Sequence, residues 1–185
     1  MKSINDILNQ LQKDHDFVLM GGIALKKYGS PRPTLDIDIA INPGDVDGMI
    51  GTMIDEIGAW FVQEVVSGEE NKVLLTNELS SVRQTLNEEK PGYGRFIISD
   101  NISTKGWYEV QQIPDFRQFD LIWDNPIPFG HLKNNARELE YGDTTFLTAS
   151  PEDLLDIKRT TFEQRGLKSD CQDIQFLEDL IEDNQ

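Results

Sequence analysis

The segment Asp36-Ile37-Asp38-Ile39-Ala40-Ile41 constrains the fold more than any other part of this sequence, because isoleucine occupies every second position. Successive side chains of a β-strand point to opposite faces of the sheet, so this alternation predicts a strand over residues 36–41. The isoleucines then enter the core, while Asp36 and Asp38 share the other face, about 6.6–7 Å apart along the strand.

Two carboxylates on one strand face repel each other, and strands disfavour aspartate. A divalent cation held between them removes that cost, and hard oxygen ligands suit Mg²⁺ or Mn²⁺. A solvated edge strand with its acids in water fits the spacing of Asp36 and Asp38 equally well. Their spacing alone therefore leaves both interpretations open.

A Gly-Gly turn precedes the acidic strand and favours the first interpretation. The apolar run Phe17–Met20 predicts a short buried strand, Gly21-Gly22 ends it, and residues 23–28 are expected to form a short helix. Bare backbone N–H groups at such a helix N-terminus can receive an anion. With Arg32 and Thr34 just before the Asp pair, a phosphate cradle, a cation and metal-binding carboxylates would converge.

The remaining patterns predict a layered α/β or α+β fold. Helices are expected over residues 3–15 and 46–57, from Ser150-Pro151 onward, and over 169–182. Strands are expected over residues 60–66, 72–77, 95–99, 107–113 and 116–123, and loops over 87–94 and 124–135.

The charge balance disfavours some classes of partner. Lys and Arg total 17 against 33 Asp and Glu, a net charge of −16, which argues against binding to duplex nucleic acid through its phosphates. No apolar run approaches the roughly 18 residues that span a bilayer, so no membrane contact is expected. The N-terminal residues lack the apolar stretch of a signal peptide, and a cytoplasmic location is expected.

Several competing sites lack the residues that they require. Cys171, His15 and His131 are too few for a tetrahedral zinc site, and both histidines are expected at the surface. No Walker A loop, dinucleotide-binding glycine motif or hydrolase elbow occurs. The large aromatic side chains are expected in the core rather than in a base-stacking platform: Trp60, Trp107, Tyr108 and Trp123.

The run Leu19-Met20-Gly21-Gly22-Ile23-Ala24-Leu25, followed by Gly29, Arg32, Thr34 and Asp36-Ile37-Asp38-Ile39, resembles the nucleotidyltransferase (polymerase-β-like) superfamily. It is most similar to the branch that contains the AbiEii-type toxins and related small nucleotidyltransferases. The resemblance implies a mixed β-sheet flanked by helices, with C-terminal helices. It also implies one domain over residues 1–185, with the catalytic sheet at about 17–148 and the C-terminal helical segment at about 150–183.

The same resemblance implies an active site. Asp36 and Asp38 would hold Mg²⁺ or Mn²⁺, and Asp120 would supply the third carboxylate and a candidate base. The nucleotide would be bound by Gly21, Gly22, Lys26, Arg32, Thr34 and Lys158, with Lys158 placed on a helix to meet the triphosphate. Asp170 and Asp173 are interpreted as acids that favour a helix N-terminus rather than as catalytic groups.

The implied reaction moves a nucleoside monophosphate from a nucleoside triphosphate to an acceptor hydroxyl on a small molecule, a protein or an RNA end. The resemblance also suggests a role in toxin–antitoxin or phage-defence systems. A non-catalytic protein of the same fold, acting as a nucleotide-binding or regulatory module, is the main alternative, but the three carboxylates argue against it. A glycosyltransferase is disfavoured by the short chain and the unexplained Gly-Gly turn.

Overall fold

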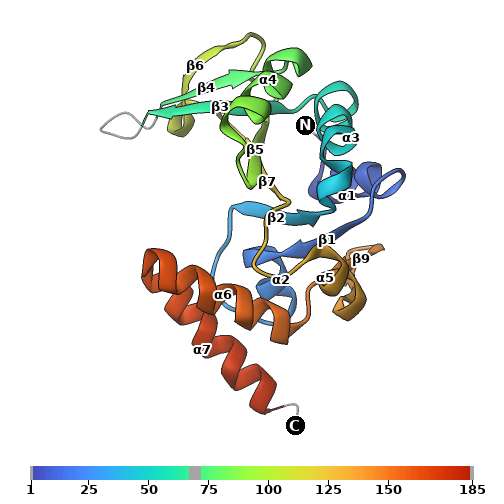
Figure 1. The fold of residues 1–185 in the computed structure, drawn as a ribbon, viewed down its shortest axis with the longest axis vertical. Helices are drawn as coiled ribbons and strands as arrows, with labels where there is room; N and C mark the ends of the chain where they lie inside the picture. The colour runs from blue at the N-terminus through green and yellow to red at the C-terminus, as the bar shows by residue number, and fades with distance from the viewer. Residues whose placement is uncertain (1, 67–71, 184–185) are drawn as a thin grey trace.

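One mixed nine-stranded sheet organises this computed structural model, which describes residues 2–66 and 72–183. The strands are β1 (Phe17–Met20), β2 (Asp36–Ile41), β3 (Trp60–Val66), β4 (Lys72–Thr76), β5 (Tyr93–Ile98), β6 (Gly106–Glu109), β7 (Arg117–Ile122), β8 (Arg137–Tyr141) and β9 (Thr144–Thr148). Their order across the sheet is β6-β4-β3-β5-β7-β2-β1-β9-β8 (Figure 1). The acidic strand β2 therefore lies near the middle of the sheet and is not an edge strand.

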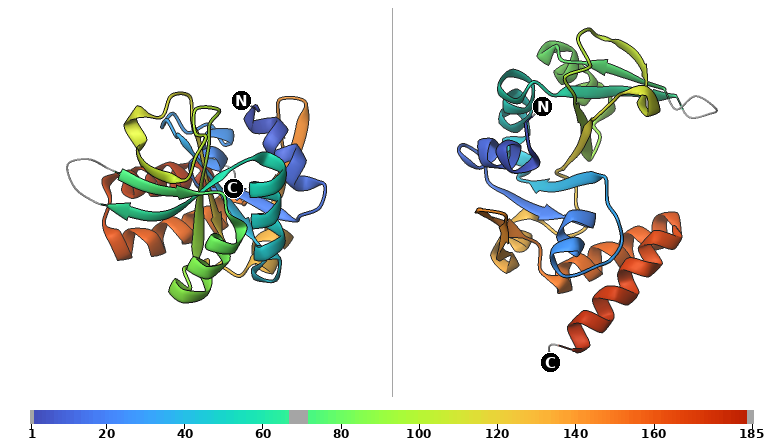
Figure 2. Two further views of the ribbon diagram at one scale, coloured as in Figure 1. Left: turned by 90° about the horizontal axis from the view of Figure 1, so that it is seen from above. Right: turned by 180° about the vertical axis from the view of Figure 1, so that it is seen from behind.

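Helices cover both faces of the sheet (Figures 1 and 2). They are α1 (Ile4–Gln12), α2 (Gly21–Lys27), α3 (Val46–Gly51), the π-helical segment η2 (Thr52–Ile57), α4 (Leu79–Glu89), α5 (Phe129–Asn135), α6 (Pro151–Arg165) and α7 (Lys168–Glu182). Short 3₁₀ turns occur at η1 (Pro43–Asp45) and η3 (Val110–Gln112). None of the helices in residues 2–66 and 72–183 has the length and apolar character needed to cross a membrane.

The isoleucine face of β2 lies in the main core, as its alternation predicts. Ile37, Ile39 and Ile41 pack with buried side chains of α1, α3, η2 and α4. A second cluster joins β1 and α2 to α5, α6 and α7 on the other face. The acids of β2 consequently lie on the sheet face that the C-terminal helices cover.

The sequence patterns predict neither α4 nor α5. The expected loop over 87–94 overlaps the end of α4, and the expected loop over 124–135 contains α5. Each helix has few buried residues, namely Val82 and Thr85 in α4 and Leu132 in α5, so the apolar period that marks a helix is weak. The strand expected over 107–113 also ends at Glu109 and continues as a 3₁₀ turn.

The prediction that His15 lies at the surface is wrong. Its side chain is only 7% exposed, and its two ring nitrogens lie 2.7 Å from Asp45 Oδ2 and 2.8 Å from Thr52 Oγ1. The ring therefore ties the end of α1 to η1 and η2. The prediction that Trp107 lies in the core is also wrong, because it is 48% exposed on β6, a strand at the edge of the sheet. Trp60 is buried as expected.

Candidate active site

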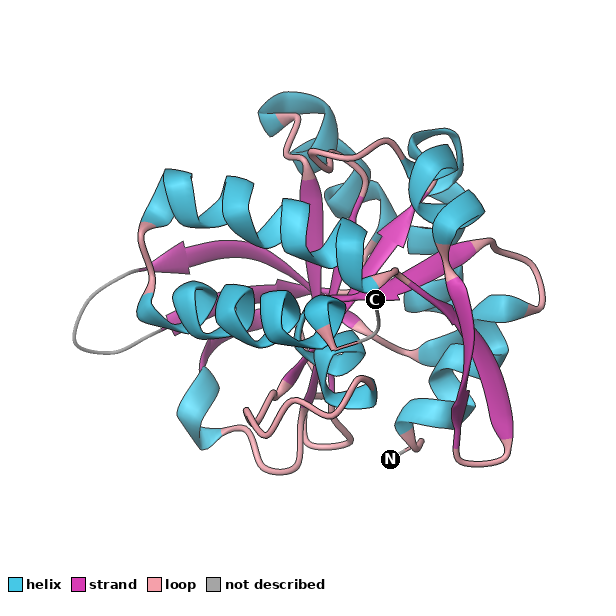
Figure 3. Ribbon diagram, turned by 90° about the horizontal axis from the view of Figure 1, so that it is seen from below, coloured by secondary structure: helices cyan, strands magenta, loops and turns pink. Residues whose placement is uncertain are grey.

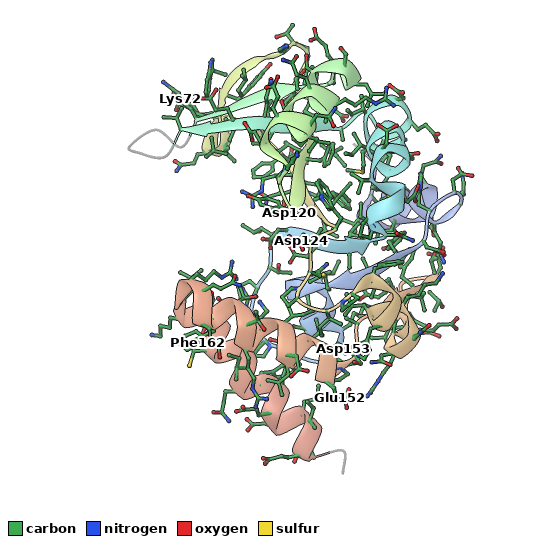
Figure 4. The ribbon with its side chains drawn as sticks, viewed as in Figure 1. Lys72, Asp120, Asp124, Glu152, Asp153 and Phe162 are labelled. Atoms are coloured by element: carbon green, nitrogen blue, oxygen red, sulfur yellow. The ribbon has the colours of Figure 1, made fainter. Side chains whose placement is uncertain are left out.

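The three predicted carboxylates meet on one face of the sheet. β2 and β7 run parallel, and their register places Asp38 directly beside Asp120. One carboxylate oxygen from each of Asp36, Asp38 and Asp120 lies within 4.8 Å of the other two. Figure 4 shows Asp120 facing the space between α6 and the part of the molecule formed by β3, β4 and β6.

The surroundings of Asp38 disfavour its ionised form. Burial, reinforced by the negative charges of Asp36 and Asp120, raises the pKa of Asp38 to about 7. The positive charge of Lys158 and a hydrogen bond from the Gly22 backbone N–H act in the opposite direction. A cluster of carboxylate oxygens with excess negative charge fits a hard divalent cation such as Mg²⁺ or Mn²⁺.

Close packing against Asp38 and Thr34 explains the two glycines. Gly21 adopts the left-handed backbone conformation, and a Cβ atom there would lie 1.8 Å from Asp38 Oδ2. A Cβ atom on Gly22 would lie 2.3 Å from Thr34 Oγ1. The Gly22 N–H, expected to face a phosphate, donates to the Asp38 carboxylate in this structure. The turn therefore brings the start of α2 onto the acids.

Thr34 orients the first acid. Its hydroxyl donates to Asp36 Oδ1 over 2.8 Å, so the segment before β2 fixes that carboxylate. Lys26 is exposed in the last turn of α2, at the opposite end of the helix from Gly21. The structure therefore brings Thr34, but not Lys26, against the three acids.

Arg95 is a site residue that the sequence patterns did not identify. It lies on β5 opposite Asp120 in the antiparallel pairing of β5 with β7. Its Nε and Nη2 atoms donate to the two carboxylate oxygens of Asp120 at 3.0 and 2.8 Å, which raises the pKa of Arg95 above its usual range. Nothing local in the sequence reveals this pair, because residues 96–119 separate its members.

The predicted cations Arg32 and Lys158 are bound by acids of α7. Arg32 donates twice to Asp173, at 2.7 and 3.0 Å, and Lys158 Nζ lies 2.8 Å from Asp173 and 3.4 Å from Asp170. Arg165 also donates twice to Asp170. Both acids are buried and paired with cations, a role that their interpretation as helix N-terminal acids does not include.

A cavity of about 260 Å³ connects this network to the carboxylates. Figure 3 shows α6 and α7 side by side, and the cavity lies where α6 approaches β2 and the start of α2. Its lining includes Gly21, Asp38, Asp124, Lys158 and Arg165. An anionic group in this cavity would contact two cations and adjoin the acids.

Comparison with known proteins identifies the family. The family model described as the nucleotidyl transferase AbiEii toxin of type IV toxin–antitoxin systems matches residues 4–178. A search of curated proteins gave no match.

Three solved structures are similar to this chain to different degrees. An antigenic nucleotidyltransferase-like protein from Paracoccidioides brasiliensis is similar with a TM-score of 0.53 and 15% identity, over 94% of this chain and 72% of that one. ANT(2")-Ia in complex with adenylyl-2"-tobramycin gives 0.49 and 13%, over 94% and 84% of the chains. The lincomycin-bound lincosamide adenylyltransferase LnuA gives 0.45 and 17%, over 96% and 95%.

The family match covers nearly the whole chain, and the Paracoccidioides structure supports the expected mixed sheet with flanking helices. The resemblance drawn from Gly21-Gly22 and the Asp pair is thereby confirmed. The protein belongs to the AbiEii family and is a nucleotidyltransferase.

Proposed function

We propose that this enzyme moves a nucleoside monophosphate from a nucleoside triphosphate to an acceptor hydroxyl, with Asp36, Asp38 and Asp120 holding Mg²⁺ or Mn²⁺. The observation that carries the proposal is the convergence of these three carboxylates within 4.8 Å on two neighbouring strands. A bound divalent cation would offset the charge of the phosphates and of the acids themselves.

The transfer is a single displacement at the α-phosphorus. The acceptor oxygen forms a bond to phosphorus, the bond to the bridging oxygen of the β-phosphate breaks, and pyrophosphate leaves. The acceptor hydroxyl loses its proton to Asp120, the candidate base, or to water. Arg95 donates to both carboxylate oxygens of Asp120 and so holds this carboxylate in place, while each oxygen keeps a second lone pair.

The triphosphate is proposed to lie in the cavity between α6 and the start of α2. Lys158 and Arg165 line this cavity and would contact the β- and γ-phosphates, while Gly21 and Gly22 allow close approach at the start of α2. Thr34 would hold Asp36, and Arg32 would act mainly through its pairing with Asp173. Lys26 has the weakest support of the predicted nucleotide contacts, because it lies at the far end of α2.

The acceptor is proposed to be a small molecule, a protein side chain or an RNA end, and not duplex nucleic acid. The net charge of −16 opposes a phosphate-binding surface, and Arg159 on the exposed side of α6 is already paired with Glu178. An anisotropy titration against duplex DNA and tRNA at about 0.15 M salt tests this proposal. Submicromolar binding to the duplex would contradict it.

The decisive experiment follows the label of an α-phosphate-labelled nucleoside triphosphate. The protein is incubated with each of the four labelled triphosphates, Mg²⁺ or Mn²⁺, and a cell extract that is then separated into small molecules, protein and RNA. We expect metal-dependent label in one fraction, loss of that label in Asp38→Asn, and retention in Asp55→Asn, which changes an exposed acid on η2. Equal labelling by wild type and Asp38→Asn would refute the proposal.

We further propose that the protein acts as a toxin in the cytoplasm; the description of its family as a toxin of type IV toxin–antitoxin systems supports the toxin role. If the transfer modifies an essential acceptor, induced expression should slow growth, and Asp38→Asn should restore it. Equal growth inhibition by the two proteins would argue against a toxin that acts through nucleotidyl transfer.

A further inference from the structure

We propose that the nucleoside of the donor triphosphate occupies a second cavity, which lies at the carboxyl ends of β2 and β7. Asp124 binds its ribose hydroxyls there, and the enzyme therefore selects ribonucleotides over deoxyribonucleotides. This inference rests on the proposed function and specifies its nucleotide. The cavity has a volume of about 330 Å³ and is lined by residues 41–43, at the end of β2, and by residues 123–125 and 127–130, which follow β7.

The parallel pairing of β2 with β7 places this cavity just beyond the catalytic acids. The two strands are neighbours that run in the same direction, so their carboxyl ends lie together. Asp38 is paired with Asp120, and β2 continues from Asp38 to its end at Ile41, about 10 Å further along the strand. A nucleoside whose phosphate lies at the acids can therefore reach the cavity.

Two residues join this cavity to the cavity between α6 and the start of α2. Asp124 and Asn125 line both of them. The cavity at α6 also has Asp38, Lys158 and Arg165 in its lining. A single nucleotide can thus extend from the acids and the two cations, across Asp124 and Asn125, into the cavity at the strand ends.

The two cavities differ in charge, which determines the direction in which a nucleotide lies. Lys158 and Arg165 suit phosphates in the cavity at α6. Among the residues that the structure describes, Asp124 is the only charged residue that lines the cavity at the strand ends, and a carboxylate repels phosphate. The rest of that lining is mostly apolar and includes Trp123, Ile127, Pro128 and Phe129. The uncharged nucleoside therefore belongs at the strand ends, and the triphosphate belongs at α6.

Asp124 lies where the ribose of such a nucleotide would be, between the phosphates and the base. Its side chain is exposed, and within residues 2–66 and 72–183 its carboxylate has no hydrogen-bond or ion-pair partner. A carboxylate accepts hydrogen bonds at both of its oxygens, so each oxygen can take one hydroxyl donor. Ribose supplies two adjacent donors, its 2′- and 3′-hydroxyls, whereas 2′-deoxyribose supplies one and 2′,3′-dideoxyribose supplies neither.

Two side-chain amides and an aromatic ring can contact the base. The amide oxygen of Asn42 accepts from the Gly44 N–H at 2.9 Å, so its amide nitrogen remains a donor. The amide nitrogen of Asn125 donates to the Ile122 carbonyl oxygen at 3.4 Å, so its amide oxygen remains an acceptor. Phe129 adds an aromatic ring, and such rings stack on bases of every kind. The cavity therefore offers a neutral base one donor, one acceptor and one aromatic contact.

A series of sugars tests the role of Asp124 by binding alone. For each of the four bases, the ribo-, 2′-deoxy- and 2′,3′-dideoxynucleoside triphosphates are titrated into the full chain with Mg²⁺ and without acceptor, and calorimetry or protein NMR follows binding. We expect each lost hydroxyl to weaken binding by about tenfold, the scale of one hydrogen bond to a charged group. Equal binding of the three sugars would overturn the proposed ribose site.

Asp124→Asn should remove most of this selectivity. The amide keeps the shape of the side chain, but it lacks the charge and replaces one acceptor oxygen with a donor. We expect the ribonucleotide to bind about tenfold more weakly than it binds the wild type, and the dideoxynucleotide to bind equally well. Asp55→Asn, which changes an exposed acid on η2, should leave the whole series unchanged. An equal loss for all three sugars would show that Asp124 acts on the metal or the phosphates and would overturn its role in ribose binding.

A second comparison addresses the base. Ribose 5-triphosphate has the sugar and the phosphates of a nucleotide but no base. Phe129→Leu, which keeps an apolar side chain at the start of α5, should weaken the nucleoside triphosphates by about fivefold and leave ribose 5-triphosphate unchanged. Equal effects on both ligands, or no effect on either, would overturn the placement of the base in this cavity.

Transfer of label from α-phosphate-labelled triphosphates separates this inference from the proposed function. Transfer that prefers ribonucleotides, with a preference that Asp124→Asn removes, supports both. Transfer at equal rates from ribo- and deoxyribonucleotides would retain the nucleotidyltransferase and overturn the ribose site. Ribose-selective binding that Asp124→Asn abolishes, in a protein that transfers label to no fraction of the extract, would support the ribose site and overturn the proposed function.

Discussion

Two groups of acidic residues lie within reach of Lys158, and they differ in how their charge is balanced. Asp170 and Asp173 on α7 are buried, and three cations surround them. The hydrogen bond from Arg165 holds the pKa of Asp170 below its usual value. On the sheet, Asp38 lies beside two more acids, and burial with their charge raises its pKa to about 7.

The contrast separates a structural role from a functional one. Buried acids that have their own cations hold elements together, and here they join α7 to α6 and to the segment that carries Arg32. Acids gathered with too few cations cost stability, and a fold keeps them only where a ligand supplies the missing charge. The predictions below test this distinction, from the largest expected effect to the smallest.

Asp38→Asn is expected to have the largest effect on activity. Turnover of nucleoside triphosphate should fall by about a thousandfold or more, the scale seen when one electrostatic group of an active site is removed. The melting temperature in EDTA should stay unchanged or rise, because the substitution relieves repulsion with Asp36 and Asp120. Asp36→Asn should behave likewise. A large loss of melting temperature without metal would show that these acids are structural.

In contrast to Asp38→Asn, Asp173→Asn should mainly lower the stability of the fold. Removing this charge leaves Arg32 and Lys158 without a shared partner, and breaking a buried pair costs about 3 kcal/mol or more of the free energy of unfolding. Urea denaturation measures the loss. The control is Asp179→Asn, which changes an exposed acid of the same helix. A loss no greater than that of the control would remove the structural role from Asp173.

Asp120→Asn lies between these cases, because Asp120 is one of the clustered acids and yet has a cation of its own. We expect turnover to fall by about a hundredfold while the affinity for nucleoside triphosphate changes little, since this carboxylate acts on the reacting oxygen and not on the triphosphate. Steady-state rates and nucleotide titrations measure the two effects. If the variant turned over at the wild-type rate, Asp124 or Glu109 would be the better third carboxylate.

Lys158→Met tests the residue that lies between the two groups. The affinity for a nucleoside triphosphate should fall by about tenfold, and that for a monophosphate by less, because the lost charge faces the outer phosphates. Nucleotide titrations at a temperature where the variant is folded give both values. Lys168→Met, at the exposed start of α7, is the control. An equal loss for both nucleotides would limit Lys158 to its pairing with Asp170 and Asp173.

The smallest expected effect is on the pH dependence of stability without metal. The pKa of Asp38 is raised from 3.8 to about 7, so between these values the folded state binds more protons than the unfolded state. Stability from this group is therefore lost as pH rises from about 4 to 7. The pKa of Asp170 is lowered, so its contribution has the opposite sign: stability from this group is lost as pH falls below about 4.

Urea denaturation at pH 5 and 7.5 in EDTA, compared between wild type and Asp38→Asn, isolates the contribution of Asp38. The difference in stability between the two proteins should grow in favour of the variant as pH rises. A difference independent of pH would show that the carboxylate of Asp38 is not destabilised in the folded protein.

The sequence by itself determined the parts of the site that are local in the chain. The alternation in Asp36–Ile41 specified the bounds of β2 and the face of its acids, because a strand repeats every two residues. Gly21-Gly22 specified the turn at the start of α2, where a Cβ atom would collide with Asp38 or Thr34. The helix starts at Ser3 and Ser150 were also predictable from the sequence, because each serine side chain accepts a hydrogen bond from the backbone N–H only three residues further on.

Only the tertiary structure decided which distant groups meet. The pairing of β5 with β7 brings Arg95 onto Asp120, and the packing of α7 on α6 neutralises Lys158 with Asp170 and Asp173. Strand register and helix packing are set by the whole core, and a helix with as few buried residues as α4 leaves little trace in the sequence. The acids were therefore predictable from local periodicity, whereas their counter-charges and the cavity between α6 and the start of α2 depend on contacts between residues far apart in the chain.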